Sequence, residues 1–188
     1  MLLDEKHIVN SDGYGDKIRV DPTTNRVGFI PVSGNFRELW SLFAIISGNP
    51  EKEKPCDGII QKKGNSHTFL VFITYLISVN YFKKYDVVVL DNCAIHMNKD
   101  ATVVQDLLWD SIMTNGEQLK VVIIYLPARS PELNPIEFIF HNLSRKLRSF
   151  KYNDLDDFGS SSVKEKTMHI LYNFSYDLIA KTYCHCGY

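Results

Sequence analysis

Hydrophobic and polar positions follow different patterns in the two halves of the chain. Residues 1–9 open with an apolar run typical of a short strand, and alternation in 17–20 and 26–32 predicts a hairpin around a turn at 21–25. Residues 39–47 (LWSLFAIIS) are apolar almost without interruption, which predicts a central strand buried on both faces. The first half is therefore expected to consist mainly of strands.

The middle of the chain combines a polar loop, a helix and a second apolar run. Residues 51–58 are polar and predict a surface loop, followed by a short strand near 59–60. Ser66 is the expected N-cap of a helix that runs to about Lys84, because apolar side chains recur there at helical period. The run VVVL at 87–90 then predicts a strand that ends at a polar pair.

Strands and helices alternate in the second half. A helix is expected at 100–114, a strand at 121–125, and a last helix after an acidic link at 153–162. Together with the strands of the first half, this order predicts an α/β fold with a mixed central β-sheet flanked by helices. Ligand sites in such sheets lie beyond the carboxyl ends of the strands.

The segment from 121 to 150 has the clearest pattern in the chain. Pro127, Pro131 and Pro135 recur every fourth residue and stiffen the turn that follows the strand. Asn134 and Pro135 are the expected N-cap and first residue of a helix. Apolar side chains then recur at helical spacing and predict a stripe that faces the core. They are Ile136, Ile139, Phe140, Leu143, Leu147 and Phe150.

Glu137 stands outside this stripe. It shares a polar face with His141, Ser144 and Arg148, which follow at intervals of four, three and four residues. Two interpretations fit this position. Glu137 either completes an Asn-x-x-Glu capping box with Asn134 or serves as a functional carboxylate. The helix alone does not decide between them.

The composition is that of one globular domain. The chain has 188 residues, of which 45% are hydrophobic and 23% charged, and its net charge is -1. Because there is no global basic field, contact with nucleic acid requires a local patch. Arg145, Lys146, Arg148 and Lys151 form such a patch, although a solvated helix end favoured by the helix dipole has the same composition.

Cysteine usage favours a reducing compartment. The four cysteines contain no CxxC pair and are too irregularly spaced for a disulfide framework. Cys184, His185 and Cys186 are adjacent, which is poor zinc geometry without a second pair of ligands. No long apolar run predicts a transmembrane span, and charge at the fourth residue argues against a signal peptide. No membrane partner is expected.

Three acidic residues are predicted at one edge of the sheet. Asp4 ends the first strand, Asp91 follows the strand at 87–90, and Glu137 enters from the helix. Carboxylates brought together repel one another unless a cation binds, so such a cluster implies a hard divalent metal. The alternative for Asp91 is a turn residue, since Asp-Asn is common after strands.

Two motifs carry a resemblance to a known family. The segments VVVLDNCAIH and YLPARSPELNPIEFIFHNLSRKLR resemble the paired signature of the DDE endonuclease domain of mariner-type transposases. MLLDEKHI is similar to that family's first strand, WSLFAIISG to the strand after it, and YCHCGY to the family's usual ending. The resemblance spans essentially the whole chain, and only 11–35 is loosely alike.

This resemblance implies an RNase H-like fold, two divalent ions (Mg²⁺ or Mn²⁺), and cleavage and joining of DNA ends. It identifies Asp4, Asp91 and Glu137 as the catalytic carboxylates and metal ligands. It therefore favours the catalytic interpretation of Glu137, which does not exclude a cap. Four residues match positions that support the site. They are Asn92, His96, Asn134 and Pro135.

DNA is the partner that the resemblance implies, with Arg145, Lys146 and Arg148 as candidate contacts. Family members carry helix-turn-helix domains ahead of the first carboxylate, whereas this chain begins three residues before Asp4. We therefore expect a single catalytic domain over 1–188 that lacks such a region. Two functions follow: a metal-dependent DNA endonuclease and strand transferase, or a catalytically silent, transposase-derived DNA-binding or interaction module.

Further expectations concern spacing, assembly and location. Asp12 is a weaker substitute for Asp4, because Asp-Gly is typical of a turn. The separation of the second and third carboxylates is on the long side for the family, which predicts an extended helix and loop at 101–120. A homodimer is expected, located in the nucleus of a eukaryote or otherwise in the cytoplasm.

Overall fold

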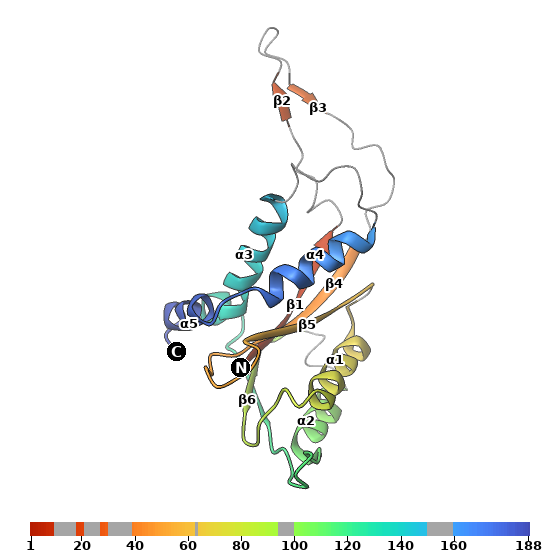
Figure 1. The fold of residues 1–188 in the computed structure, drawn as a ribbon, viewed down its shortest axis with the longest axis vertical. Coiled ribbons are helices and arrows are strands. Elements are labelled where there is room, and N and C mark those ends of the chain that lie inside the picture. Colours follow the sequence, from red (N-terminus) through yellow and green to blue (C-terminus); the bar gives the residue numbers. More distant parts are fainter. Residues whose placement is uncertain (10–17, 21–26, 30–38, 63, 94–99, 150–159) are drawn as a thin grey trace.

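A computed structural model describes residues 1–9, 18–20, 27–29, 39–62, 64–93, 100–149 and 160–188 (Figure 1). The predicted turn at 21–25, together with Asp12 and His96, lies outside these ranges. Within them, no helix is both long and apolar enough to cross a lipid bilayer.

Five strands form one sheet. They are β1 (Leu2–Val9), β4 (Leu39–Ile46), β5 (Cys56–Gln61), β6 (Val87–Leu90) and β7 (Val122–Tyr125). Their order across the sheet is β5-β4-β1-β6-β7. β4 runs antiparallel to β1 and β5, whereas β6 runs parallel to β1 and β7 parallel to β6. The predicted mixed central sheet is confirmed.

A second, two-stranded sheet pairs β2 (Ile18–Val20) with β3 (Val27–Phe29) in antiparallel orientation. These strands lie between β1 and β4 in the chain. The hairpin predicted from their alternation is therefore confirmed.

Helices cover both faces of the main sheet (Figure 1). α1 (Ser66–Ser78) and α2 (Asp100–Asp110) pack on one face. α3 (Pro135–Ser149), α4 (Ser160–Tyr172) and α5 (Tyr176–His185) pack on the other. Each face has its own apolar core, so the protein has three layers, with the sheet in the middle.

The sequence of β4 explains this layering. Leu42 and Ala44 point into the core beneath α3, whereas Phe43 and Ile45 point into the core beneath α1. All four side chains are 0% exposed. Burial of a large apolar side chain contributes about 1.5–3 kcal/mol. A run that is apolar at every position is therefore most stable inside the sheet, as predicted.

Helix α1 differs from its predicted bounds at both ends. Asn65, and not Ser66, is the N-cap: its side chain accepts from the backbone N–H of Thr68 at 2.9 Å, and the Thr68 hydroxyl accepts from the backbone N–H of Asn65 at 2.9 Å. The helix ends at Ser78, earlier than predicted, because Asn80 takes a left-handed φ of 52°. A left-handed Asn just past the last turn is a common helix terminator.

Two other predicted boundaries were wrong. β5 begins at Cys56, inside the predicted loop, because its backbone pairs with β4 from there on. Gly58 permits this close pairing, since a Cβ atom there would lie 2.7 Å from a backbone oxygen of β4. α2 ends at Asp110, before its predicted end, and the chain then forms an isolated bridge between Ile112 and Gln118.

Candidate active site

The sheet brings the first two predicted carboxylates to the same level. Leu3 of β1 lies beside Leu90 of β6 in the parallel pairing, so the next residues, Asp4 and Asp91, follow side by side. Leu3 and Leu90 both pack in the core beneath α1 and α2. Because side chains alternate along a strand, Asp4 turns toward the opposite face, on which α3 lies. Asp91 comes after the end of β6 and lines a pocket together with Glu137 of α3.

Asp4 lies within β1 and not at its end, so its predicted position in the strand was wrong. β1 continues to Val9 because it pairs with β4 along its whole length. β6 is shorter and stops at Leu90, which places Asp91 directly after it. Asp4 still reaches the predicted edge, since the longer β1 extends past the end of β6.

The Asp4 carboxylate is buried and hydrogen-bonded. Its residue is 4% exposed. Oδ1 accepts from the backbone N–H of Glu5 at 2.7 Å, and Oδ2 accepts from the side-chain amide of Asn134 at 2.8 Å. Such bonds offset part of the cost of burying a charged group. The second bond also ties β1 to the start of α3, which carries Glu137.

This bond overturns the predicted cap. Asn134 was expected to cap α3 with its side-chain oxygen, but Oδ1 is buried and has no hydrogen-bond partner among the described residues. The reason is that the amide of Asn134 is turned toward Asp4. Asn134 and Glu137 are joined through the backbone instead, by a bond of 3.1 Å from the Glu137 N–H to the Asn134 carbonyl. The capping-box interpretation of Glu137 therefore loses the side-chain bond that defines it.

The loop after β6 is held at two points. The Asp91 carboxylate accepts from the backbone N–H of Cys93 at 3.1 Å, which is the turn interaction expected of Asp in this place. The side-chain amide of Asn92 donates to the carbonyl of Leu126, the residue after β7. Asn92 therefore links the loops that follow the two parallel strands.

Asp91 and Glu137 line one pocket of about 350 Å³. Glu137 is exposed on the first turn of α3. The pocket lies between the loop after β6, the loop after β7 and the start of α3. The other lining residues are Asn92, Cys93, Leu126, Pro127, Arg129, Ser130, Pro131 and Asn134. Asp4 lies next to this pocket, bonded to Asn134.

No three Asp, Glu, His or Cys side chains in the described ranges form a ready-made metal cluster. Asp4, Asp91 and Glu137 are therefore not a closed set of three ligands around one point. Mg²⁺ commonly keeps several water molecules and takes only one or two carboxylates. Carboxylates that do not surround a single point are compatible with this coordination. The ligand roles of these three residues stay predictions.

The predicted DNA contacts on α3 lie away from the pocket. Arg145 follows Glu137 by two turns of helix, which at 1.5 Å per residue is about 12 Å. Its guanidinium donates to the side chain of Asn142 at 2.8 Å. Lys146 Nζ lies 4.9 Å from the centre of the Phe174 ring, within cation–π distance. The nucleic-acid role of these residues stays a prediction.

Arg129 is a pocket residue that the sequence patterns did not single out. It lies on the loop after β7 and has a φ of 59°, which is uncommon for a residue other than glycine. The available signal was a cation inside the proline-rich turn LPARSP. Of the predicted supporting residues, Pro135 is buried at the start of α3, whereas His96 lies outside the described part. The side chain of Arg148, a predicted DNA contact, also lies outside it.

The C-terminal cysteines are free thiols, as are Cys56 and Cys93. His185, which lies between Cys184 and Cys186, packs edge-on against Phe138 with ring centres 4.7 Å apart. Its place is thus explained by packing. The thiol of Cys56 is buried, and this burial raises its pKa to about 12.

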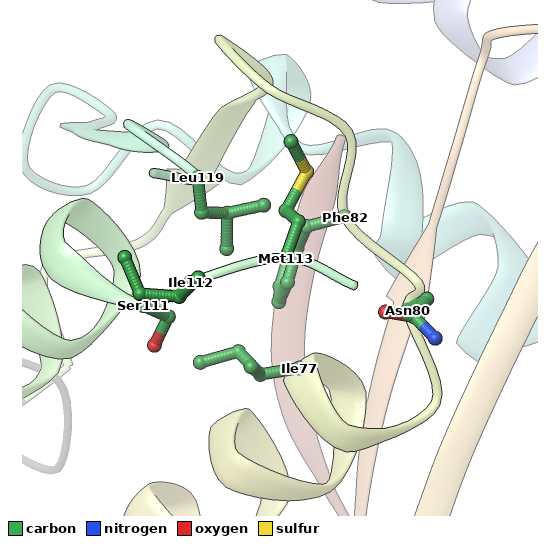
Figure 2. A pocket seen from close by; sticks show the side chains of 7 residues that line it. All are labelled: Ile77, Asn80, Phe82, Ser111, Ile112, Met113 and Leu119. Carbon is green, nitrogen blue, oxygen red and sulfur yellow. The ribbon is translucent and has the colours of Figure 1, made fainter. Parts of the chain in front are cut away.

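Described residues outside this site line two further pockets. One is lined by uncharged residues at the end of α1 and in the segment after α2, with Ile77, Ile112 and Leu119 around it (Figure 2). It offers no charged metal ligand. The other measures about 380 Å³ and includes Asp57 and Tyr75 among lysine and glutamate side chains.

Comparison with known proteins places the fold. Residues 33–159 match the family described as DDE superfamily endonuclease. No curated protein sequence matches the chain. Among solved structures, the Mos1 transposase paired-end complex with the left transposon end is similar, with a TM-score of 0.65 and 14% identity over 98% of this chain and 51% of that chain. The Mos1 mariner paired-end complex with Mn gives the same four values.

A more distant structure is also similar. The simian T-cell lymphotropic virus intasome in complex with PP2A regulatory subunit B56 gamma has a TM-score of 0.52 and 7% identity, over 74% of this chain and 44% of that chain. At such identities the likeness concerns the fold, and the predicted RNase H-like fold is confirmed. The chain spans about half the length of the Mos1 chains that it matches.

Proposed function

Because the chain belongs to the DDE superfamily endonucleases, we propose that it is the catalytic domain of a metal-dependent DNA endonuclease and strand transferase of the mariner transposase type. One observation carries the proposal. Asp4 and Asp91 each come one residue after a paired position, Leu3 on β1 and Leu90 on β6, and Asn134 ties Asp4 to the segment that carries Glu137. This arrangement of residues from distant parts of the sequence supports a shared site at the edge of the sheet.

Two Mg²⁺ or Mn²⁺ ions are the proposed cofactors, with Asp4, Asp91 and Glu137 as ligands. Carboxylate oxygens are the donors that hard cations prefer. The buried Oδ1 of Asn134, which has no partner among the described residues, can accept a hydrogen bond from a water molecule that such an ion carries. Bound there, the two ions would supply activation of a water or hydroxyl on one side of a phosphodiester and stabilisation of the leaving oxygen on the other.

The protein's own residues would hold this site in shape. Asn134 fixes the orientation of the Asp4 carboxylate, and Asn92 fixes the loop that carries Asp91 against the loop after β7. Pro127 and Pro131 restrict the backbone of that second loop. Groups held in place before substrate arrives lose less entropy during the reaction, which is the usual requirement of a preorganised site.

DNA is the proposed substrate. One similar Mos1 transposase structure is a paired-end complex with the left transposon end, and another is a strand transfer complex. In this chain, Arg145, Lys146 and Arg148 would contact phosphates beyond the pocket along α3. Such contacts make DNA affinity fall steeply with salt concentration.

The test is cleavage of duplex DNA by the full chain with Mn²⁺ or Mg²⁺. Asp91→Asn and Glu137→Gln each remove one charge with little change of shape. Each should lower the cleavage rate by at least about a hundredfold, because bound metal stabilises the transition state by several kcal/mol. Glu132→Gln is the matched control. Glu132 lies between β7 and α3, a few residues before Glu137, but does not line the pocket.

Unchanged cleavage in Asp91→Asn and Glu137→Gln would overturn the proposal. DNA binding by the wild type without metal-dependent cleavage would instead identify a catalytically silent module. We also propose that residues 1–188 act as one catalytic domain, that two copies assemble as a homodimer, and that the protein works in a reducing compartment. That compartment is the nucleus in a eukaryote and otherwise the cytoplasm.

A further inference from the structure

The pocket lined by Asp91 and Glu137, here called the carboxylate pocket, has one positively charged residue among its described lining residues, Arg129. Its described acidic residues are Asp91 and Glu137, and the other described lining residues are uncharged. DNA is a polyanion, and its phosphates are repelled by carboxylates across the same pocket. The positive charge of Arg129 would therefore attract a phosphate group that the carboxylates repel.

The backbone of Arg129 makes this placement unusual. Its φ of 59° lies in the left-handed region, which glycine and asparagine adopt far more readily than arginine. Backbone conformations of this kind persist where the surrounding structure imposes them, and they gather at functional sites. Here the prolines at 127 and 131 flank the residue and stiffen the loop.

The guanidinium of Arg129 is available to a ligand. The residue is exposed, and no described residue forms a hydrogen bond or ion pair with its side chain. Arg145, by contrast, is engaged with Asn142. A structural role for Arg129 as the ion-pair partner of Asp91 or Glu137 is therefore not supported by the contacts that are present.

Resting on the proposed function, we infer that Arg129 binds a phosphate group of the DNA strand that enters the carboxylate pocket. The planar guanidinium presents paired N–H donors that match two oxygens of one phosphate. It lies on the loop between β7 and α3, among the residues that line the pocket together with Asp91 and Glu137. It thereby holds the strand in a pocket whose acidic residues alone would repel it.

The test compares two charge-removing variants with the same backbone conformation. Arg129→Asn removes the charge, and asparagine tolerates a left-handed φ. Lys120→Asn is the matched control, because Lys120 also has a left-handed φ, of 54°, but lies outside the pocket. Affinity for a short DNA duplex is measured by fluorescence anisotropy in Ca²⁺, with thermal unfolding of each variant recorded alongside.

Arg129→Asn should weaken DNA binding by about tenfold to a hundredfold, the usual worth of a hydrogen bond to a charged group. Lys120→Asn should change it by less than about twofold, because isolated surface charges are screened by salt. Both variants should unfold no more readily than the wild type. Arg129→Gly, which also suits a left-handed φ, should repeat the Arg129→Asn result.

A neutral methylphosphonate placed at successive positions of the DNA identifies the contact. At one position it should weaken binding to the wild type and leave binding to Arg129→Asn unchanged. Equal affinities of Arg129→Asn, Lys120→Asn and wild type, or the absence of such a position, would overturn the inference. These readouts need no cleavage, so failure of the catalytic proposal, seen with Asp91→Asn and Glu137→Gln, is distinguished from failure of this one.

Discussion

Asp4 in β1 and Asp57 in β5 are two carboxylates that the fold buries almost equally, at 4% and 1% exposure. Each accepts a hydrogen bond of 2.7 Å from the backbone N–H of the residue that follows it. Each also belongs to or adjoins a pocket of similar size, about 350 Å³ beside Asp4 and about 380 Å³ at Asp57. Burial and residue type therefore do not separate the two sites.

Their hydrogen-bond donors do separate them. The Asp57 carboxylate accepts from the hydroxyls of Tyr172 at 3.1 Å and Tyr75 at 3.4 Å. Acidic and basic residues are balanced in its pocket. The basic ones are Lys52, Lys54 and Lys83, and the acidic ones are Glu51, Glu53 and Asp57. Such a carboxylate is already compensated by the protein and has no need of a metal ion.

The known hydrogen-bond donors to Asp4 are of another kind. Its amide partner, Asn134, keeps a buried oxygen without a partner among the described residues, and Asp91 and Glu137 line the adjoining pocket. Under the proposed function, metal ions bound there would offset the charge of these carboxylates when a DNA strand enters. The comparison teaches that two equally buried carboxylates are distinguished by the groups around them and not by burial.

The largest expected effect is on catalysis. Asp4→Asn should lower metal-dependent DNA cleavage by at least about a hundredfold, because it removes a proposed metal ligand. Asp57→Asn should leave cleavage per folded molecule unchanged, since Asp57 lines a different pocket from Asp91 and Glu137. Single-turnover cleavage in Mn²⁺ measures both. Equal losses in the two variants would break the distinction between the sites.

A smaller effect is expected from the residue that holds Asp4. Asn134→Ala should weaken Mg²⁺ binding by about ten- to a hundredfold, the range seen when the partner of a metal ligand is removed. Asn142→Ala is a suitable control, because Asn142 lies on the same helix and donates to the Phe138 carbonyl at 2.9 Å. Metal titration monitored by thermal unfolding gives both affinities. An unchanged affinity in Asn134→Ala would show that the Asp4 bond is merely structural.

The free energy of unfolding should fall more in the Asp57 variant than in the Asp4 variant, which is the reverse of the order expected for cleavage. Asp57→Ala should lower the free energy of unfolding by about 1–3 kcal/mol, because Tyr75 and Tyr172 lose their acceptor. Asp4→Asn in metal-free buffer should cost less, since it also removes repulsion from Asp91. Urea unfolding of the two variants measures the difference. A greater loss of unfolding free energy in Asp4→Asn would mean that the protein stabilises the Asp4 carboxylate more than it stabilises that of Asp57.

The smallest expected effect is a pH dependence at the Asp57 site. Burial, and then the charge of Asp57, raise the pKa of Tyr172 and of Tyr75. A raised pKa favours the neutral hydroxyl in the folded state, so its contribution to stability is complete below about pH 10 and is lost as the pH rises through the folded pKa. Urea unfolding at pH 8 and pH 11 should show this loss. The loss should be smaller in Asp57→Asn, and an equal loss would contradict the coupling.

Local patterns predicted the strand before Asp91 and the turn and helix that carry Glu137. The run VVVL and the turn LPARSPELNPIE place Asp91 and Glu137 through signals contained within a few residues. The role of Asn134 could not be predicted in this way, because its bond to Asp4 joins residues 130 positions apart. The same pattern, Asn-Pro-x-Glu, instead predicted a cap that the structure does not form.

Backbone conformation was the second feature that the sequence did not predict. Arg129 has a left-handed φ that its residue type does not favour, so no local preference indicates it. Asn80, by contrast, has a residue type that often takes this conformation, and it ends α1 where apolar periodicity alone predicted continuation. Sequence patterns therefore predicted most elements, although the single last helix that they predicted is two helices, α4 and α5. Tertiary contacts set the ends of the elements and the orientation of Asn134.

The most direct test of the central claim is a crystal structure of the full chain grown with Mn²⁺, with the ions located by anomalous scattering. The account predicts peaks about 2.0–2.3 Å from carboxylate oxygens of Asp4, Asp91 and Glu137, and none at Asp57. Peaks at Asp57, or their absence from all three acidic residues at a saturating Mn²⁺ concentration, would contradict it.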